Sequence, residues 1–137
     1  MFERIMVPVD LARTERLEKA LGVAAMLVER AEVDVHLVGV TAVTPSEVAH
    51  SPAAYREKLE RFAEERSAAL GVRCRATALE SHDPAVDLDR HLKGAAEALD
   101  ADLIVMGSHV PRFGDWLTHA HARWLAGHTS RSLFIVR

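Results

Sequence analysis

Five short apolar segments alternate along the chain with segments of helical periodicity, and this alternation restricts the fold more than any other feature. The segments with strand character cover 2–10, 33–40, 72–79, 101–106 and 133–136. Between them, apolar residues recur every three or four positions, as in amphipathic helices. This order predicts an α/β fold with an open, doubly wound, five-stranded parallel sheet, four helices and right-handed crossovers. A length of 137 residues suits one domain, so we expect a single domain over 1–137.

Local signals predict where the helices begin and end. Thr14 is a fair N-cap for the first helix. Ser51 followed by Pro52 fits the start of the second helix, and Gly71 is placed to end it. The last helix is expected over 115–126, closed by the glycine that follows.

The strand segments differ in patterning, which predicts their places in the sheet. Segment 72–79 alternates apolar with polar residues, so one of its faces is wet and it is expected at an edge. Segment 101–106 is nearly all apolar, as in a central parallel strand.

Composition excludes several classes of protein. With 49% hydrophobic residues, 27% charged residues and one cysteine, the chain is neither disordered nor a disulfide scaffold. Its formal charge of −3 does not favour nucleic acid, although the part after residue 106 is basic. No apolar run approaches the roughly 20 residues of a membrane helix, and the opening has no secretory pattern. We therefore expect a cytoplasmic protein without nucleic-acid binding or membrane insertion.

Several catalytic and phosphate-binding motifs are missing from the sequence. It has no G-x-x-x-x-G-K-[ST], no G-x-G-x-x-G after a strand and no G-x-S-x-G. The C-terminal part is rich in histidine, but His119 and His121 diverge on a helix, whereas a zinc site needs three or four converging ligands. We predict no metal site.

The expected sheet places ligands beyond the carboxyl ends of strands, where the strand order reverses. The loops at that place follow the first and fourth strands. They contain Asp10 in one case and Gly107, Ser108 and His109 in the other. Asp10 has two interpretations: a carboxylate that contacts a ligand, or a turn residue that caps the following loop.

Two of these loop segments, Val-Pro-Val-Asp at 7–10 and Met-Gly-Ser-His at 106–109, carry a resemblance to a known family. With further similar segments at 39–42, 83–89 and 113–117, the chain resembles the universal stress protein family over its full length. It looks most similar to the small, single-domain bacterial members.

The resemblance implies a sheet of order 3-2-1-4-5, a dimer and, as in many members, a site for ATP or AMP. In those members an aspartate after the first strand meets the ribose or adenine side, which corresponds to Asp10. In those members the backbone at the end of the second strand contacts adenine, and the corresponding residue here is Val40. The candidate nucleotide-binding residues are Pro8, Val9, Asp10, Val40, Met106, Gly107, Ser108, His109, Val110, His119, Ala120 and His121.

The sequence departs from the family pattern in the half of the site that would hold phosphate. Gly107 is present, but Val110 stands where the second glycine of the turn is expected. His119 and Ala120 stand where the subgroup has Gly-Ser. The side chains of Val110 and His119 cover backbone N–H groups that glycine would leave accessible to phosphate, and Ala120 lacks the hydroxyl of the serine in the family pattern. We therefore predict a weakened phosphate half beside an intact adenine half.

These observations favour a dimeric, regulatory stress-response module that acts through an unidentified protein partner. In the implied strand order the last strand (Leu133, Phe134, Ile135, Val136) lies at a sheet edge and is apolar on both faces, which invites pairing with a second copy. Two alternatives stay open: an interaction protein of the same fold that binds no nucleotide, and a slow ATPase. Against the enzyme stands the lack of a carboxylate–metal pair or base beside the phosphate loop.

Overall fold

The computed structural model describes residues 1–108 and 119–137, and it contains one parallel sheet. Its strands are β1 (Arg4–Val9), β2 (Asp34–Ala42), β3 (Arg73–Ser81), β4 (Leu103–Gly107) and β5 (Ser132–Val136). They pair in the order β3-β2-β1-β4-β5, all parallel. The predicted doubly wound sheet and its strand order are therefore confirmed, including the edge position of the alternating strand.

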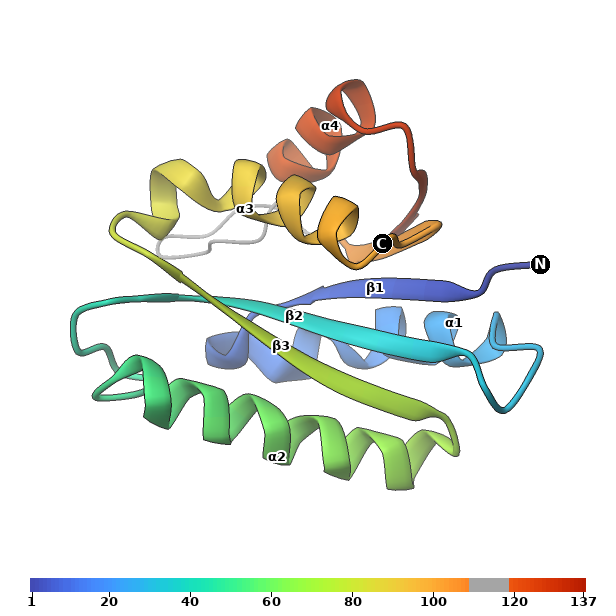
Figure 1. Cartoon of the computed structure of the whole chain (residues 1–137), viewed down its shortest axis with the longest axis horizontal. Helices are drawn as coiled ribbons and strands as arrows, with labels where there is room; N and C mark the ends of the chain where they lie inside the picture. The colour runs from blue at the N-terminus through green and yellow to red at the C-terminus, as the bar shows by residue number, and fades with distance from the viewer. Residues whose placement is uncertain (109–118) are drawn as a thin grey trace.

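Helices cover both faces of this sheet. They are the 3-10 helix η1 (Leu11–Arg16) and the α-helices α1 (Glu18–Met26), α2 (Pro52–Leu70), α3 (Pro84–Ala98) and α4 (His119–His128). Helices α1 and α2 pack on one face, and α3 and α4 pack on the other (Figure 1). The carboxyl ends of β1 and β2 thus emerge between two helical layers.

Capping side chains fix the starts of two helices, and one of them differs from the prediction. Thr14 does not cap the first helix but lies inside η1, which begins directly after Asp10. The Asp10 carboxylate caps it by accepting a hydrogen bond from the Ala12 N–H at 2.9 Å. Aspartate caps a helix at least as well as threonine, and Asp10 precedes Thr14 in the chain, directly after β1. The Ser51 cap of α2 is confirmed by its 3.1 Å hydrogen bond, and Gly71 ends that helix with φ 68°.

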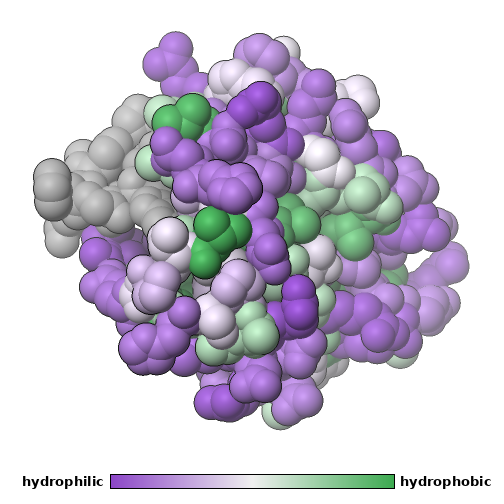
Figure 2. All heavy atoms as spheres, turned by 60° about the vertical axis from the view of Figure 1, so that its left-hand side comes forward, coloured by the Kyte–Doolittle hydropathy of each residue, from purple (hydrophilic) through white to green (hydrophobic). Residues whose placement is uncertain are grey.

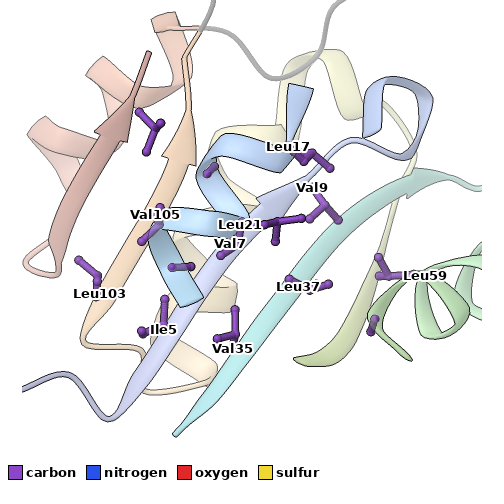
Figure 3. Packing of buried hydrophobic residues seen from close by; sticks show 14 of the residues in the cluster. Ile5, Val7, Val9, Leu17, Leu21, Val35, Leu37, Leu59, Leu103 and Val105 are labelled. Atoms are coloured by element: carbon purple, nitrogen blue, oxygen red, sulfur yellow. The ribbon is translucent and has the colours of Figure 1, made fainter. Parts of the chain in front are cut away.

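Two layers of buried side chains hold the helices to the sheet. On the α1–α2 face, Ile5, Val7 and Leu37 pack with Leu21 and Leu59 (Figure 3). On the opposite face, residues of β1, β2 and β4 pack with α3 and α4; they include Met6, Val38, Ile104, Met106, Leu92 and Leu125. Each such side chain, once buried, stabilises the fold by roughly 1.5–3 kcal/mol. The two layers therefore fix how the helices sit on the strands from which the site residues project.

The two edges of the sheet present different surfaces. On β3, Arg73 and Arg75 are exposed and contact the Asp34 carboxylate of β2. On β5, the exposed side chains include Phe134 and Ile135, whose exposed fractions are 45% and 39%. The last strand is thus an edge strand with apolar surface.

Candidate functional site

A cavity of about 80 Å³ lies at the carboxyl ends of β1 and β2, between the two helical layers. Val9 and Val40 from the strand ends form its apolar walls with Leu88 of α3 and Val48 of the loop after β2. Figure 2 brings this end of the molecule forward and shows small apolar patches among mostly polar side chains. The apolar walls suit a flat ring, whereas small-molecule sites usually hold roughly 300–1,000 Å³. A whole nucleoside would therefore extend beyond the cavity.

Asp10 lines this cavity and also caps η1. Its Oδ1 accepts the hydrogen bond from the Ala12 N–H. A carboxylate has two oxygens and can accept several hydrogen bonds. The geometry therefore makes the two interpretations of Asp10, cap and ligand contact, compatible with each other.

Tyr55, on the first turn of α2, is a cavity residue that the sequence does not single out. Its helical spacing with Leu59 indicates a core position, and its side chain is indeed buried, with 4% exposed. Yet it also lines the cavity. Burial raises the pKa of the phenol far above its ordinary value, and the nearby negative charge of Asp10 raises it further. At neutral pH the ring therefore carries a hydroxyl group.

Gly39 allows Tyr55 to lie where it does. A Cβ at Gly39 would overlap the Tyr55 hydroxyl and would stand 3.0 and 3.1 Å from two ring carbons. A glycine inside a strand marks such a close approach. This glycine was the sequence signal that could have drawn attention to the cavity.

The loop after β2 forms the outer wall of the cavity. The Ser46 N–H donates to the Ala49 carbonyl oxygen at 2.9 Å, and the Ser46 hydroxyl accepts from the N–H groups of Val48 and Ala49 at 3.3 Å each. The Lys58 ammonium of α2 donates to the Val48 carbonyl oxygen. These bonds hold Ser46, Glu47 and Val48 as a folded turn beside the cavity.

Other predicted site residues near the strands do not line the cavity. Pro8 is buried within β1, paired in register with Val38. Met106 is buried among the side chains under α3 and α4. Gly107 ends β4, and the N–H of Ser108 donates to the Val136 carbonyl oxygen at 2.7 Å.

The remaining predicted residues belong to the segment after Ser108. His109 and Val110 lie outside the described residues, as does the expected start of the last helix. That helix, α4, is described from His119 to His128, two residues beyond the expected end. Ala120 is exposed on its first turn.

His121 joins α4 to α3. Its Nδ1 lies 2.5 Å from Oδ1 of Asp89, and both side chains are largely buried, with 18% and 24% exposed. This contact gives the histidine a structural partner. Within residues 1–108 and 119–137, no three histidine, cysteine or carboxylate side chains converge as a metal ion would require.

The fold and the cavity place the chain in the class of open, doubly wound α/β proteins whose ligand sites lie at the carboxyl ends of the strands. The profile of the Universal stress protein family matches residues 1–137, so the chain belongs to that family. No curated protein sequence matches it. Across the part of the chain that the structure describes, no helix has the length and apolar character needed to span a membrane.

Solved structures of the family share this fold at low sequence identity. The chain is similar to a universal stress protein from Archaeoglobus fulgidus, with 19% identity, full coverage of both chains and a TM-score of 0.71. A structure of the universal stress protein from the same organism in complex with dAMP has 20% identity, covers 98% and 97% of the two chains and gives 0.67. A family protein from Arabidopsis thaliana with AMP bound has 15% identity, covers 97% and 90% and gives 0.63.

Proposed function

We propose that residues 1–137 form one cytoplasmic, regulatory universal stress protein domain that binds an adenine nucleotide, ATP or AMP, with its base in the cavity at the ends of β1 and β2. The observation that carries this proposal is the position of the cavity. Asp10 and Val40, to which the family resemblance assigns the ribose or adenine side, both line it, as does the candidate residue Val9. Structural neighbours with dAMP and with AMP bound lend support.

The phosphate half of this site is weakened in our proposal. Val110, His119 and Ala120 replace two glycines and a hydroxyl in the family pattern. Each lost charge-assisted hydrogen bond to phosphate costs about 1.5–3 kcal/mol. Adenosine and AMP should therefore bind nearly as well as ATP.

Calorimetric titration of the wild-type chain with adenosine, AMP and ATP tests this proposal. We expect the three affinities to agree within about tenfold, since the shared adenosine part carries the binding. An affinity for ATP more than about a hundredfold above that for adenosine would show an intact phosphate half. Mass spectrometry of small molecules released on denaturing freshly purified protein would identify a nucleotide that copurifies.

The position of His119 gives a second test of the phosphate half. If the histidine supplies positive charge, ATP affinity rises as the pH falls from about 8 to about 6, through the usual histidine pKa near 6.5. His119→Ala then removes that pH dependence. If His119 only obstructs, the triple variant Val110→Gly, His119→Gly, Ala120→Ser restores ATP binding with little pH dependence. Failure of ATP to bind either the wild type at pH 6 or the triple variant at pH 7.5 would overturn the nucleotide proposal.

We further propose that the domain acts as a homodimer formed through β5 and that this dimer recognises a regulatory protein. Support comes from the exposed apolar side chains of Phe134 and Ile135 on an edge strand. Pairing with a second copy about a two-fold axis covers such an edge without open-ended growth.

The small cavity favours a second candidate function, a dimeric interaction protein that binds no nucleotide. A volume of about 80 Å³ holds a few water molecules in place of a ligand. The titrations above separate the two candidates, because this one predicts no heat of binding for any of the three ligands.

A further inference from the structure

Tyr55 lines the cavity, and its hydroxyl forms no hydrogen bond with another described residue. The side chain is 96% buried, and burial and the negative charge of Asp10 both raise the pKa of its phenol. The hydroxyl lies against the backbone of Gly39, at the cavity that Tyr55 and Val40 line. The hydroxyl can therefore still donate a hydrogen bond to a ligand in the cavity and accept one from it.

The surrounding structure fixes where this hydroxyl lies. The ring packs against the backbone of β2 at Gly39, which leaves no room for a Cβ. The first turn of α2, which carries Tyr55, is held by the Ser51 cap. The hydroxyl is thus held in position before any ligand arrives, which lowers the entropic cost of using it.

The residues that line the cavity indicate which kind of ligand group could bind beside the Tyr55 hydroxyl. The apolar walls of Val9, Val40 and Leu88 suit the faces of a planar aromatic ring. A phenol that keeps its proton is both donor and acceptor, and the carboxylate of Asp10 beside it is an acceptor. A ring with a nitrogen acceptor on its edge, next to a donor group, complements this pair.

We propose that the Tyr55 hydroxyl is a specificity-determining contact that donates a hydrogen bond to a ring nitrogen of the bound adenine base. This inference rests on the proposed function and deepens it. It assigns base selection to a residue of α2 rather than to the strand ends alone. Ligands whose ring carries C–H in place of that nitrogen leave the hydroxyl unsatisfied and bind more weakly.

Deaza analogues provide the test. The wild type and Tyr55→Phe are titrated with adenosine and with 1-deaza-, 3-deaza- and 7-deazaadenosine. We expect the wild type to bind one of the three analogues about tenfold more weakly than adenosine, the effect of one neutral hydrogen bond. Tyr55→Phe should bind adenosine about tenfold more weakly than the wild type and should no longer distinguish that analogue from adenosine.

Thr41→Val is the matched control. Thr41 is also buried on the cavity wall, but its hydroxyl already donates to the Ala42 carbonyl oxygen at 3.2 Å. We expect this variant to keep the discrimination between adenosine and the deaza analogue. The assignment to Tyr55 would be overturned if Thr41→Val no longer distinguished adenosine from the deaza analogue while Tyr55→Phe still did.

The possible outcomes separate the two proposals. If the wild type binds adenosine and Tyr55→Phe binds it equally well, the inference about Tyr55 is overturned, and the proposed function stands. Wild type that binds no adenosine overturns both.

A second measurement does not depend on how well the variant folds. Tyr55 is the only tyrosine in the sequence, so ¹³C-labelled tyrosine gives a single ring signal in NMR spectra. We expect adenosine to shift this signal and the weakly bound deaza analogue, at saturation, to shift it less. Equal shifts from all four ligands would overturn the inference.

Discussion

The two edge strands of the sheet, β3 and β5, are built in opposite ways. Strand β3 runs alongside β2 over nine residue pairs and exposes arginines, and Asp34 of β2 bridges Arg73 and Arg75. Strand β5 pairs with β4 over five residues and exposes Phe134 and Ile135. Charged residues on an edge oppose pairing with another chain, whereas apolar residues permit it. The difference is the reason that the proposed dimer is assigned to β5 and not to β3.

The largest expected effect comes from placing a charge on the apolar edge. Ile135→Lys should weaken self-association more than about a hundredfold, because the lysines of two copies would lose water and repel one another. Sedimentation at several concentrations measures this. Thr77→Lys, the same new side chain on the other edge strand, is the control and should leave association unchanged. A wild type that sediments as a monomer at tens of micromolar, on the order of ordinary assay concentrations, would contradict a β5 dimer.

The reverse change should make the charged edge resemble the apolar one. Replacing both Arg73 and Arg75 with leucine removes the positive charges and leaves apolar side chains on β3. We expect species larger than the dimer, at roughly tenfold lower protein concentration than the wild type requires. Light scattering detects them. An unchanged size distribution would mean that features other than charge protect this edge.

A smaller effect is expected from the ion pairs of the charged edge. Burial raises the pKa of Asp34, but the hydrogen bonds from Arg73 and Arg75 outweigh it, so the pKa lies below its ordinary value. The carboxylate therefore stabilises the fold above the unfolded-state pKa of about 3.9, and this contribution is lost as the pH falls through the lower folded-state value.

Asp34→Asn tests this contribution. It should cost about 1 kcal/mol or less at pH 7, because the arginines are half exposed and solvent screens the pairs. Urea unfolding from pH 7 to pH 2 should show a flatter acid dependence for the variant than for the wild type. Parallel curves would show that the ion pairs contribute nothing net.

The smallest expected effect concerns His36, on β2 beside the same edge. Burial lowers its pKa, Asp34 opposes this, and the charges of Arg75 and Arg4 add to it. The unfolded chain therefore binds a proton more readily, so stability falls as the pH drops below the unfolded-state value of about 6.5. His36→Gln should reduce the loss of stability between pH 7 and pH 5 by a few tenths of a kcal/mol. Thermal unfolding measures it, with the exposed His50→Gln as the control.

The sequence predicted the sheet well because strand periodicity and edge patterning are local properties. The alternation in 72–79 identified β3 as an edge, and the Ser51 cap and Gly71 fixed α2. Thr14 failed as a cap because Asp10 stands first at the end of β1 and takes the role.

The site was less predictable from local patterns. Asp10 followed from the position of a strand end and from the resemblance, and Val40 followed from the resemblance alone; both line the cavity. Tyr55 did not, because a tyrosine at helical spacing has the same pattern whether it packs in the core or faces a cavity. Its contact with Gly39 joins two elements through the tertiary fold, and no periodicity reports such a contact.

The hydrogen bond from the Ser108 N–H to the Val136 carbonyl oxygen joins the residue after β4 to the last residue of β5. The chain that leaves β4 toward the strand ends is thereby tethered to the strand proposed for self-association. A ligand that moved Ser108 would disturb this bond, and its binding free energy would then be coupled to that of dimer formation. Such coupling is reciprocal: the factor by which ligand changes the dimerisation constant equals the factor by which dimerisation changes ligand affinity. The protein's own concentration would then set its sensitivity to the ligand.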